Sequence, residues 1–250
     1  MTAPYAIYWF RRDLRLVGNV LLLESLRKYQ GRVLCFFCFD PVFLARADFS
    51  VDRFQFFLQT LQQLKIDLQQ LGGDLLVLDS GPFSVFPKLL DACYKNKHVY
   101  PHAVFFNRDY EPFARSRDQK VTQLFSEYGV EVQTGKDHLF IEPEALLNFA
   151  QKEAPYRVFS RFFVVWRKML LAESCLAQEI AYQKKSLKKY ESEKGLLSSK
   201  KIFMLIWKDI IPVASQHENV FLSDKLDHYL YENQNHVRIK IPPAGFHQAI

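Results

Sequence analysis

The sequence predicts an α/β protein with a doubly wound, five-stranded parallel sheet of the Rossmann-like kind. Two observations support this prediction: short apolar runs recur along the first 135 residues, and segments with helical periodicity separate them. Strands that alternate with helices in this way form a parallel sheet with helices on both faces. The expected strands are residues 5–10, 33–39, 75–79, 103–106 and 130–133.

Each expected helix has apolar residues on one face. Leu22, Leu23 and Leu26 mark the first helix, and a longer stripe marks a second helix that ends at Gly72 and Gly73. The third helix begins at Pro82, and the fourth ends near Gly129. The apolar positions of these three helices are Phe54, Phe57, Leu58, Leu61, Leu64 and Leu68, then Val85, Leu89 and Leu90, then Val121, Leu124 and Phe125.

The pattern changes after residue 135. We expect residues 1–135 to form the α/β domain, 136–232 to form a linker with helices, and 233–250 to begin a helical domain that the chain does not complete. One linker helix is expected over 164–180. The lysine-rich stretch 184–194 is more typical of a solvated helix face or a linker than of a nucleic-acid patch.

The composition is that of an ordinary globular protein, with 49% hydrophobic and 24% charged residues. A net charge of +6 is compatible with a polyanionic partner but does not establish one. No apolar run approaches the ~18 residues of a membrane span. The apolar start runs directly into Arg11 and Arg12 without a preceding basic region, unlike a secretory signal. We therefore expect a cytoplasmic protein without a membrane segment, and the oligomeric state stays open.

The cysteines do not indicate a metal or redox site. Cys35 and Cys38 are spaced like a zinc or redox pair, but they lie in an expected buried strand. Residues three apart on a strand point to opposite faces, so we interpret both as small core residues. Cys93 and Cys175 have no evident partner, and no Ser-His-Asp or metal-ligand cluster has usable spacing.

Polar residues gather behind the expected strands, where parallel sheets bind their ligands. The first loop has neither of the glycine-rich phosphate-binding patterns, which argues against an ordinary NAD or ATP fold. Carboxylates and arginines beside aromatic rings suit a planar heterocycle with NH donors. The polar residues are Arg11 and Arg12, then Asp40, then Asp79, Ser80 and Gly81, then Asn107, Arg108, Asp109 and Glu111, then Lys136 and His138; the aromatic ones are Phe10, Phe39 and Tyr110.

Structural roles compete with ligand binding at these positions. For Arg12, Asp13 and Arg15 we favour an ion-pair cluster that fixes the loop against a neighbouring domain. Asp109 and Glu111 precede a helix, so capping of that helix and ligand binding are equally compatible with their position. A further charged group on that helix, consisting of Arg115, Arg117 and Asp118, is expected to make local or interdomain ion pairs.

Four stretches resemble the N-terminal domain of the DNA photolyase/cryptochrome family. They are WFRRDLR at 9–15, SVDRFQFFLQTLQQL at 50–64, NRDYEPFARSRD at 107–118 and YRVFSRFF at 156–163. Together they cover about the first two thirds of the chain in the family's order and spacing. The resemblance implies an α/β domain that holds a light-harvesting antenna, followed by a helical domain that binds FAD and damaged DNA.

The same resemblance implies site residues. Family members with a deazaflavin antenna line its pocket at positions that fall here on Asp40, Arg53, Asp109 and Glu111. Members with a folate antenna share the glutamate but commonly lack the two aspartates. A deazaflavin or flavin mononucleotide (FMN) antenna is therefore favoured over a reduced folate. We add the neighbouring Arg11 and Phe39 to this candidate cofactor site, and we expect no catalytic residue and no metal ligand in the chain.

Two departures from the family stand out. The chain has Gly18-Asn19 where the family usually has Asp-Asn, which we expect to weaken the cap of the first helix. The family's Thr-Ser-x-Leu-Ser phosphate-binding segment, tryptophan electron-transfer chain and flavin-ring asparagine have no counterpart within 250 residues. Trp9, Trp166 and Trp207 lie outside the positions of that tryptophan chain. We therefore expect either a fragment of a longer protein or a truncated gene product, with the FAD-binding domain only begun at 233–250.

The function implied is the antenna-binding half of a photolyase, in which light-excited reduced FAD donates an electron to a pyrimidine dimer in damaged DNA. A light-sensing cryptochrome would have a similar N-terminal half, and a stand-alone chromophore-binding module without catalysis is a third possibility. These residues do not distinguish cyclobutane dimers from 6-4 photoproducts.

The first prediction concerns FAD. We expect the 250-residue chain by itself neither to bind FAD nor to repair DNA, because the segments that the family uses for both tasks have no match in it. Absorbance of the cofactor released from denatured purified protein measures this directly. Recovery of one FAD per chain would contradict the prediction.

Overall fold

The computed structural model describes residues 4–44, 46, 49–78, 80–97, 99–172 and 181. Its core is a five-stranded parallel sheet with the strand order β3-β2-β1-β4-β5. The strands are β1 (Ala6–Phe10), β2 (Val33–Cys38), β3 (Leu75–Leu78), β4 (Ala103–Asn107) and β5 (Glu131–Gly135). The predicted sheet is confirmed, and each strand ends within about two residues of its expected bounds, which is the usual uncertainty of such boundaries.

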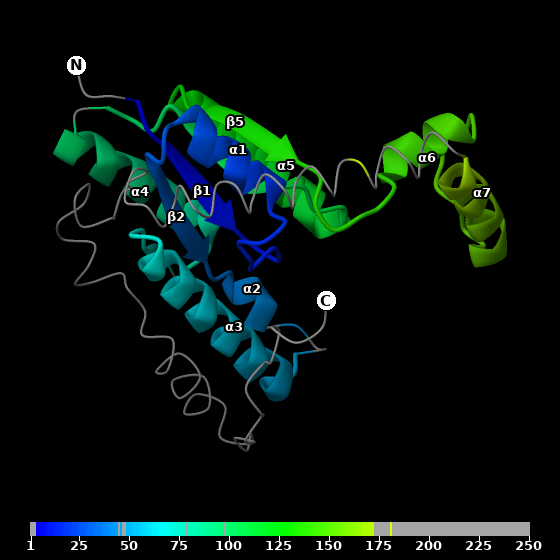
Figure 1. Cartoon of the computed structure of the whole chain (residues 1–250), viewed down its shortest axis with the longest axis horizontal. Helices are drawn as coiled ribbons and strands as arrows, with labels where there is room; N and C mark the ends of the chain where they lie inside the picture. The colour runs from blue at the N-terminus through cyan, green and yellow to red at the C-terminus, as the bar shows by residue number, and fades with distance from the viewer. Residues whose placement is uncertain are drawn as a thin grey trace.

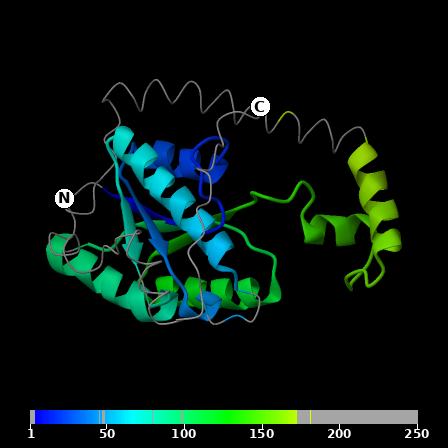
Figure 2. The ribbon, with the colours of Figure 1, turned by 90° about the horizontal axis from the view of Figure 1, so that it is seen from below.

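Helices cover both faces of the sheet (Figure 2). On one face lie α1 (Val20–Lys28) and α3 (Val51–Gln70), and on the other lie α4 (Pro82–Lys97) and α5 (Pro112–Glu127). The single-turn helix α2 (Pro41–Leu44) was not expected from the sequence. The doubly wound arrangement is therefore as predicted, because the buried stripes of the four long helices divide between the two faces.

The two faces of β1 belong to separate hydrophobic clusters. Tyr8 packs with α1 and α3, whereas its neighbour Trp9 packs with α4 and α5. Cys35 and Cys38 divide in the same way, so the prediction that they are core residues on opposite faces is confirmed. Burial raises the pKa of Cys35, which keeps that thiol protonated.

Helix α1 keeps a side-chain cap although Gly18 replaces the family's aspartate. Asn19 is the N-cap residue, and its Oδ1 accepts a hydrogen bond from the backbone N–H of Leu22 at 3.3 Å. Gly18 precedes it with a φ of +69°, a conformation that glycine adopts without steric cost. The expected weakening of this cap is therefore not apparent in the structure.

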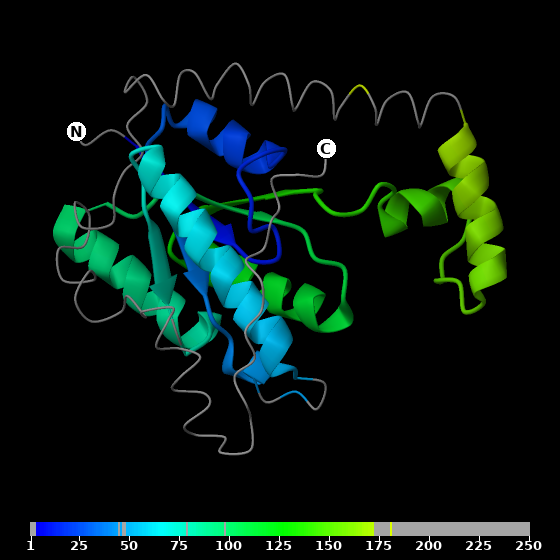
Figure 3. The same cartoon turned by 60° about the horizontal axis from the view of Figure 1, so that its bottom comes forward.

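Beyond the sheet, α6 (Pro143–Phe149) and α7 (Phe159–Leu171) lie to one side of the α/β domain (Figures 1 and 3). Helix α7 begins five residues before the expected 164, and no residue of it is buried. Phe159 is 73% exposed and Val164 is 65% exposed. This segment therefore presents an apolar surface to solvent.

Several expectations fall outside the described residues. These are the end of the 164–180 helix, the lysine-rich stretch 184–194, Asp79, Cys175 and Trp207, together with most of the proposed linker and all of 233–250. Among the helices that are described, none combines the length and apolar character that crossing a bilayer would require.

The second prediction follows from the exposed surface of α7. We expect backbone amides of α7 to exchange hydrogen much faster than those of β1 and β2, because few buried apolar contacts hold α7 in place. Mass-spectrometric hydrogen exchange on the purified chain measures both regions in one experiment. Equal protection of α7 and the central strands would contradict this expectation.

Candidate functional site

The candidate site lies where the winding direction of the sheet reverses. The chain runs from β1 outward to β2 and β3, then returns to place β4 on the other side of β1. Ligands of open parallel sheets bind beyond the carboxyl ends of the strands at such a point. Here the two loops that flank it are residues 11–19 and 108–111, which contain most of the predicted polar residues.

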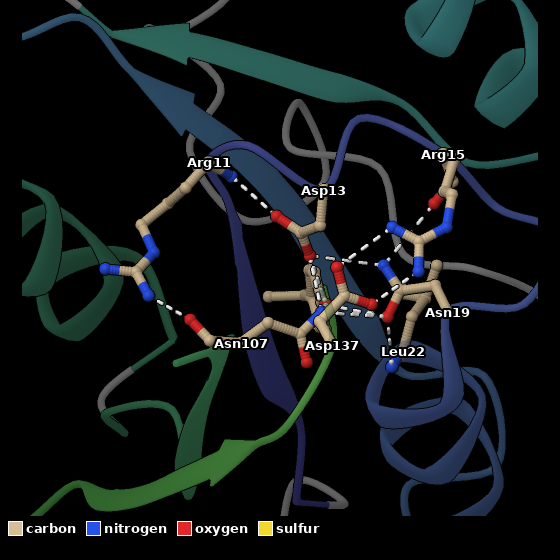
Figure 4. Close-up of polar contacts among 8 residues, drawn as sticks. Arg11, Asp13, Arg15, Asn19, Leu22, Asn107 and Asp137 are labelled. Atoms are coloured by element: carbon tan, nitrogen blue, oxygen red, sulfur yellow. Dashed lines mark hydrogen bonds and ion pairs between the residues drawn. The ribbon is translucent and has the colours of Figure 1, made fainter. Parts of the chain in front are cut away.

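A buried carboxylate joins the two loops (Figure 4). Asp13 is 4% exposed, and its Oδ2 accepts hydrogen bonds from the Tyr8 hydroxyl at 2.8 Å and from the Asn107 side-chain amide at 2.8 Å. Its Oδ1 accepts the backbone N–H of Arg11 at 2.9 Å. The Asn19 amide donates to the same Oδ2 at 3.2 Å. One side chain thus connects β1, its following loop, the α1 cap and the end of β4.

The protonation of Tyr8 suits this arrangement. Burial, and secondarily the neighbouring Asp13 carboxylate, raises the pKa of Tyr8 well above its ordinary value. The phenol therefore keeps its proton and acts as the donor to Asp13. Because Asp13 accepts at both of its oxygens, it does not need a ligand to satisfy its charge.

Arg11 and Arg12 follow each other in the chain but have different surroundings. The Arg11 side chain points away from the Asp13 cluster (Figure 4) and is 8% exposed. It donates to Asp118 Oδ1 at 2.5 Å and to the Asn107 carbonyl, and it lies 5.0 Å from the Trp9 ring centroid. Arg11, predicted as a cofactor contact, therefore holds α5 against the central strands.

Arg12 is 58% exposed and bridges the two predicted carboxylates of the β4–α5 loop. Its Nε lies 3.2 Å from Asp109 Oδ2, and its Nη2 lies 2.8 Å from Glu111 Oε2. Glu111 occupies the N-cap position of α5 but makes no side-chain cap hydrogen bond. Asp109 is 7% exposed, and its Oδ1 is buried without a hydrogen-bond partner in the described part of the chain. In the described chain, Asp109 and Glu111 thus make ion pairs with Arg12, and Glu111 does not cap α5.

Arg15, Arg115 and Arg117 also make ion pairs, whereas Asp13, expected in a cluster with Arg12 and Arg15, accepts hydrogen bonds from neutral groups instead. Arg15 pairs with Asp137, at 2.9 Å for the longer of its two contacts. Arg117 donates to Asp118 at 2.9 Å.

The remaining predicted residues lie at the end of β2. Asp40 Oδ1 accepts the backbone N–H of Val42 at 3.1 Å, and the exposed Arg53 is in the first turn of α3. Phe39 is 4% exposed and packs edge-on against Phe37, which makes it a core residue. Asp40 follows β2 and Asp109 follows β4, and these strands flank β1 on opposite sides. Neighbouring strands lie ~4.8 Å apart, so β2 and β4 are about 10 Å apart.

The loop after β3 approaches this end of the sheet closely. A Cβ atom on Gly81 would lie 3.4 Å from Pro41 Cδ and 3.8 Å from Asp40 Oδ1. Gly81 has a φ of +78°, and Ser80 before it also has a positive φ of 85°. The two residues that follow the predicted Asp79 therefore have turn conformations, and Gly81 lies close to Asp40.

Two exposed aromatic residues that follow the predicted carboxylates closely in the chain were not identified from the sequence. Phe43 in α2 is 50% exposed and follows Asp40 by three residues, and Phe113 in α5 is 54% exposed and follows Glu111 by two. Exposed phenyl rings at the start of helices that follow ligand-binding strands can stack on a planar ligand. Their position shortly after a carboxylate is visible in the sequence, but the sequence does not show whether such a ring is buried or exposed.

Residues that follow β5 contact the β4–α5 loop on its other side. The Tyr110 hydroxyl donates to Glu142 Oε1 at 2.6 Å, and Arg108 Nη2 lies 3.2 Å from the same oxygen. His138 lies edge-to-face with Tyr110, with ring centroids 5.4 Å apart. Burial, followed by the hydrogen bond with Glu142, raises the pKa of Tyr110. Among the described residues, no group of three or more His, Cys, Asp and Glu side chains could hold a metal ion.

Comparison with known proteins assigns the family. The sequence model of the DNA photolyase family matches residues 6–181. The chain belongs to this family. It is 35% identical over 166 residues to an uncharacterized 31.6 kDa protein of Synechococcus sp., covering 66% of this chain and 55% of that protein. It is 32% identical over 167 residues to a deoxyribodipyrimidine photo-lyase of Synechococcus sp., covering 67% of this chain and 32% of the enzyme.

Other photolyase-family proteins resemble it as well. Vertebrate cryptochromes are among its relatives. An archaeal photolyase from Sulfolobus tokodaii, solved with two FAD molecules and discussed for a novel light-harvesting cofactor, matches with a TM-score of 0.51 and 29% identity over 63% of this chain and 33% of that one. The chain thus spans about a half or less of the length of these relatives. It is the N-terminal α/β part of the photolyase/cryptochrome fold that matches.

The third prediction tests the buried carboxylate. Tyr8→Phe removes the hydroxyl that donates to Asp13, and we expect the free energy of unfolding to fall by about 1 to 3 kcal/mol. Tyr128→Phe is the matched control, because that partly exposed hydroxyl makes no hydrogen bond in the described structure. Urea unfolding of both variants gives the comparison. If the two variants lose the same stability, Tyr8 does not support the network.

Proposed function

We propose that this chain binds a light-harvesting chromophore at the carboxyl ends of β1, β2 and β4, as the antenna domain of a DNA photolyase. The observation that supports this most strongly is the pair Asp109 and Glu111 beside the reversal point of the sheet. One is buried with an unpartnered oxygen, and the other is 52% exposed. Two carboxylates of this kind suit the NH donors of a flat heterocycle.

The proposed site uses Asp40 and Arg53 on one side of β1 and Asp109 and Glu111 on the other. The separation of about 10 Å between β2 and β4 would let one multi-ring heterocycle reach both pairs. Arg11 and Phe39 would support the walls from the two faces of the sheet without direct contact, because both are buried in packing contacts. The exposed rings of Phe43 and Phe113 would supply stacking surfaces at the rim.

The residues fit a deazaflavin or FMN better than a reduced folate. The archaeal photolyase among the solved structures contains two FAD molecules and is described as implying a novel light-harvesting cofactor. A flavin-type ring offers the imide N–H that an unpartnered carboxylate oxygen would accept. When bound, such a chromophore would absorb light and pass the excitation on.

The whole protein would then repair UV-induced pyrimidine dimers in DNA with FAD held by a helical domain. The proposed division is 1–135 for the antenna domain, 136–232 for a linker and 233–250 for the beginning of the FAD-binding domain. The alternative of a cryptochrome-type light sensor rests on the cryptochromes among the relatives. Repair of dimer-containing DNA under blue light by the full gene product would separate the two functions.

The fourth prediction tests the antenna site. Glu111→Ala removes an acceptor for the heterocycle, and we expect it to weaken chromophore binding by about 1 to 3 kcal/mol, or tenfold to a hundredfold. Its effect on stability should be small, because its ion pair with Arg12 is exposed and its side chain does not cap α5. Fluorescence titrations with a deazaflavin, FMN and a reduced folate, each with a melting curve, measure both quantities.

The matched control is Glu127→Ala, an exposed glutamate at the other end of α5. It should change neither affinity nor the preference among the three chromophores. A lowered melting temperature with unchanged affinity in Glu111→Ala would remove Glu111 from the site.

A further inference from the structure

A second cavity lies on the opposite side of the β4–α5 loop from Asp40 and Arg53. Its volume is about 230 Å³, and its walls come from the end of β4, the side of α5, β5 and the start of α6. The lining residues that matter here are Tyr110, Asp118, Gln119, Thr134 and Glu142. Asp109 also lines it and is shared with the proposed antenna site, whereas Glu111, Asp40 and Arg53 are not among its lining residues.

The walls of this cavity are held in place by contacts between distant segments. Tyr110 donates to Glu142 Oε1 at 2.6 Å, and Arg108 pairs with the same oxygen at 3.2 Å. Asp118 Oδ1 accepts from Arg11 at 2.5 Å and from Arg117 at 2.9 Å. Both carboxylates are therefore fixed before any ligand arrives, which lowers the entropy cost of binding.

Each of these carboxylates has one oxygen left over. Within the described residues, no hydrogen bond reaches Asp118 Oδ2 or Glu142 Oε2, and none involves the Gln119 amide or the Thr134 hydroxyl. The lining therefore offers two carboxylate acceptors close to an amide and a hydroxyl that can donate. The half-buried Tyr110 adds an aromatic ring to this polar wall.

These groups define the chemistry of a ligand. Carboxylates accept well from N–H donors, so the available oxygen of each carboxylate can accept from a ring N–H or from an adjacent exocyclic amino group. A neighbouring ring carbonyl would accept from Gln119 or Thr134. The volume is below the roughly 300 to 1,000 Å³ of typical drug-sized sites, so it suits a single ring system rather than a dinucleotide.

Guanine combines all three features: a ring N–H, an adjacent amino group and a carbonyl on a flat bicyclic ring. We propose that the cavity between α5 and the start of α6 binds the guanine base of a nucleoside or nucleotide. Glu142 or Asp118 accepts from its N–H edge, Gln119 donates to its carbonyl, and Tyr110 contacts the ring. The cavity shares Asp109 with the proposed antenna site, but Glu142 and Gln119 belong only to the cavity, so variants at these two positions test it separately from the antenna proposal.

Calorimetric titration of the purified chain with guanosine and, separately, with inosine tests the proposal. Inosine is guanosine without the exocyclic amino group, so its affinity should be lower by about tenfold or more. Glu142→Gln should weaken guanosine binding by a similar factor, because a neutral amide is a weaker acceptor of N–H groups than a carboxylate. Glu127→Gln, at the far end of α5, is the matched control and should bind guanosine as the wild type does.

Because Glu142→Gln could change the position of α6, a second pair of variants on α5 tests the cavity independently. Gln119→Leu removes a cavity donor, and Gln123→Leu makes the same change one turn further along α5, outside the cavity lining. Weaker guanosine binding in Gln119→Leu but not in Gln123→Leu supports the site. Equal affinity for guanosine and inosine, absence of saturation at millimolar guanosine, or identical binding by Gln119→Leu and Gln123→Leu would overturn it.

Discussion

The buried carboxylate of Asp13 is the interaction on which the arrangement of this molecule's loops depends. It accepts hydrogen bonds from Tyr8 in β1, Asn19 at the α1 cap, Asn107 at the end of β4 and the backbone of its own loop. A carboxylate removed from water is costly unless such partners satisfy it. The requirement to satisfy this one charge therefore fixes four parts of the chain relative to one another.

The positions of the two consecutive arginines follow from this anchor. Once the Arg11 backbone is bonded to Asp13, the Arg11 side chain lies on the α5 face of the sheet, where Asp118 and the Asn107 carbonyl receive it. Arg12 then remains at the surface and reaches the carboxylates of the β4–α5 loop. One arginine is therefore a structural support, and the other is part of the candidate site.

The β4–α5 loop, from Arg108 to Glu111, contributes to two different places. Asp109 and Glu111 pair with Arg12 at the proposed antenna site. Arg108 and Tyr110 hold the start of α6 and line the second cavity, which Asp109 lines as well. A short loop thus contributes side chains to both places, and Asp109 is common to them. It also means that a change at Tyr110 would be expected to disturb the second cavity directly and the antenna carboxylates only through the backbone.

The sequence by itself determined the fold class, the five strands and the covering helices, because periodicity and strand-to-helix alternation are local properties. It also located the polar residues behind the strands and placed Cys35 and Cys38 on opposite faces. Only the tertiary structure decided that Arg11 is a buried support, that Phe39 is a core residue, that Glu111 pairs with Arg12 instead of capping α5, and that Phe43 and Phe113 are exposed. Those outcomes depend on partners up to 107 residues away, such as Asp118 for Arg11. Whether a charged or aromatic side chain faces a ligand, a partner ion or the core is set by the packing of distant segments, which no local pattern contains.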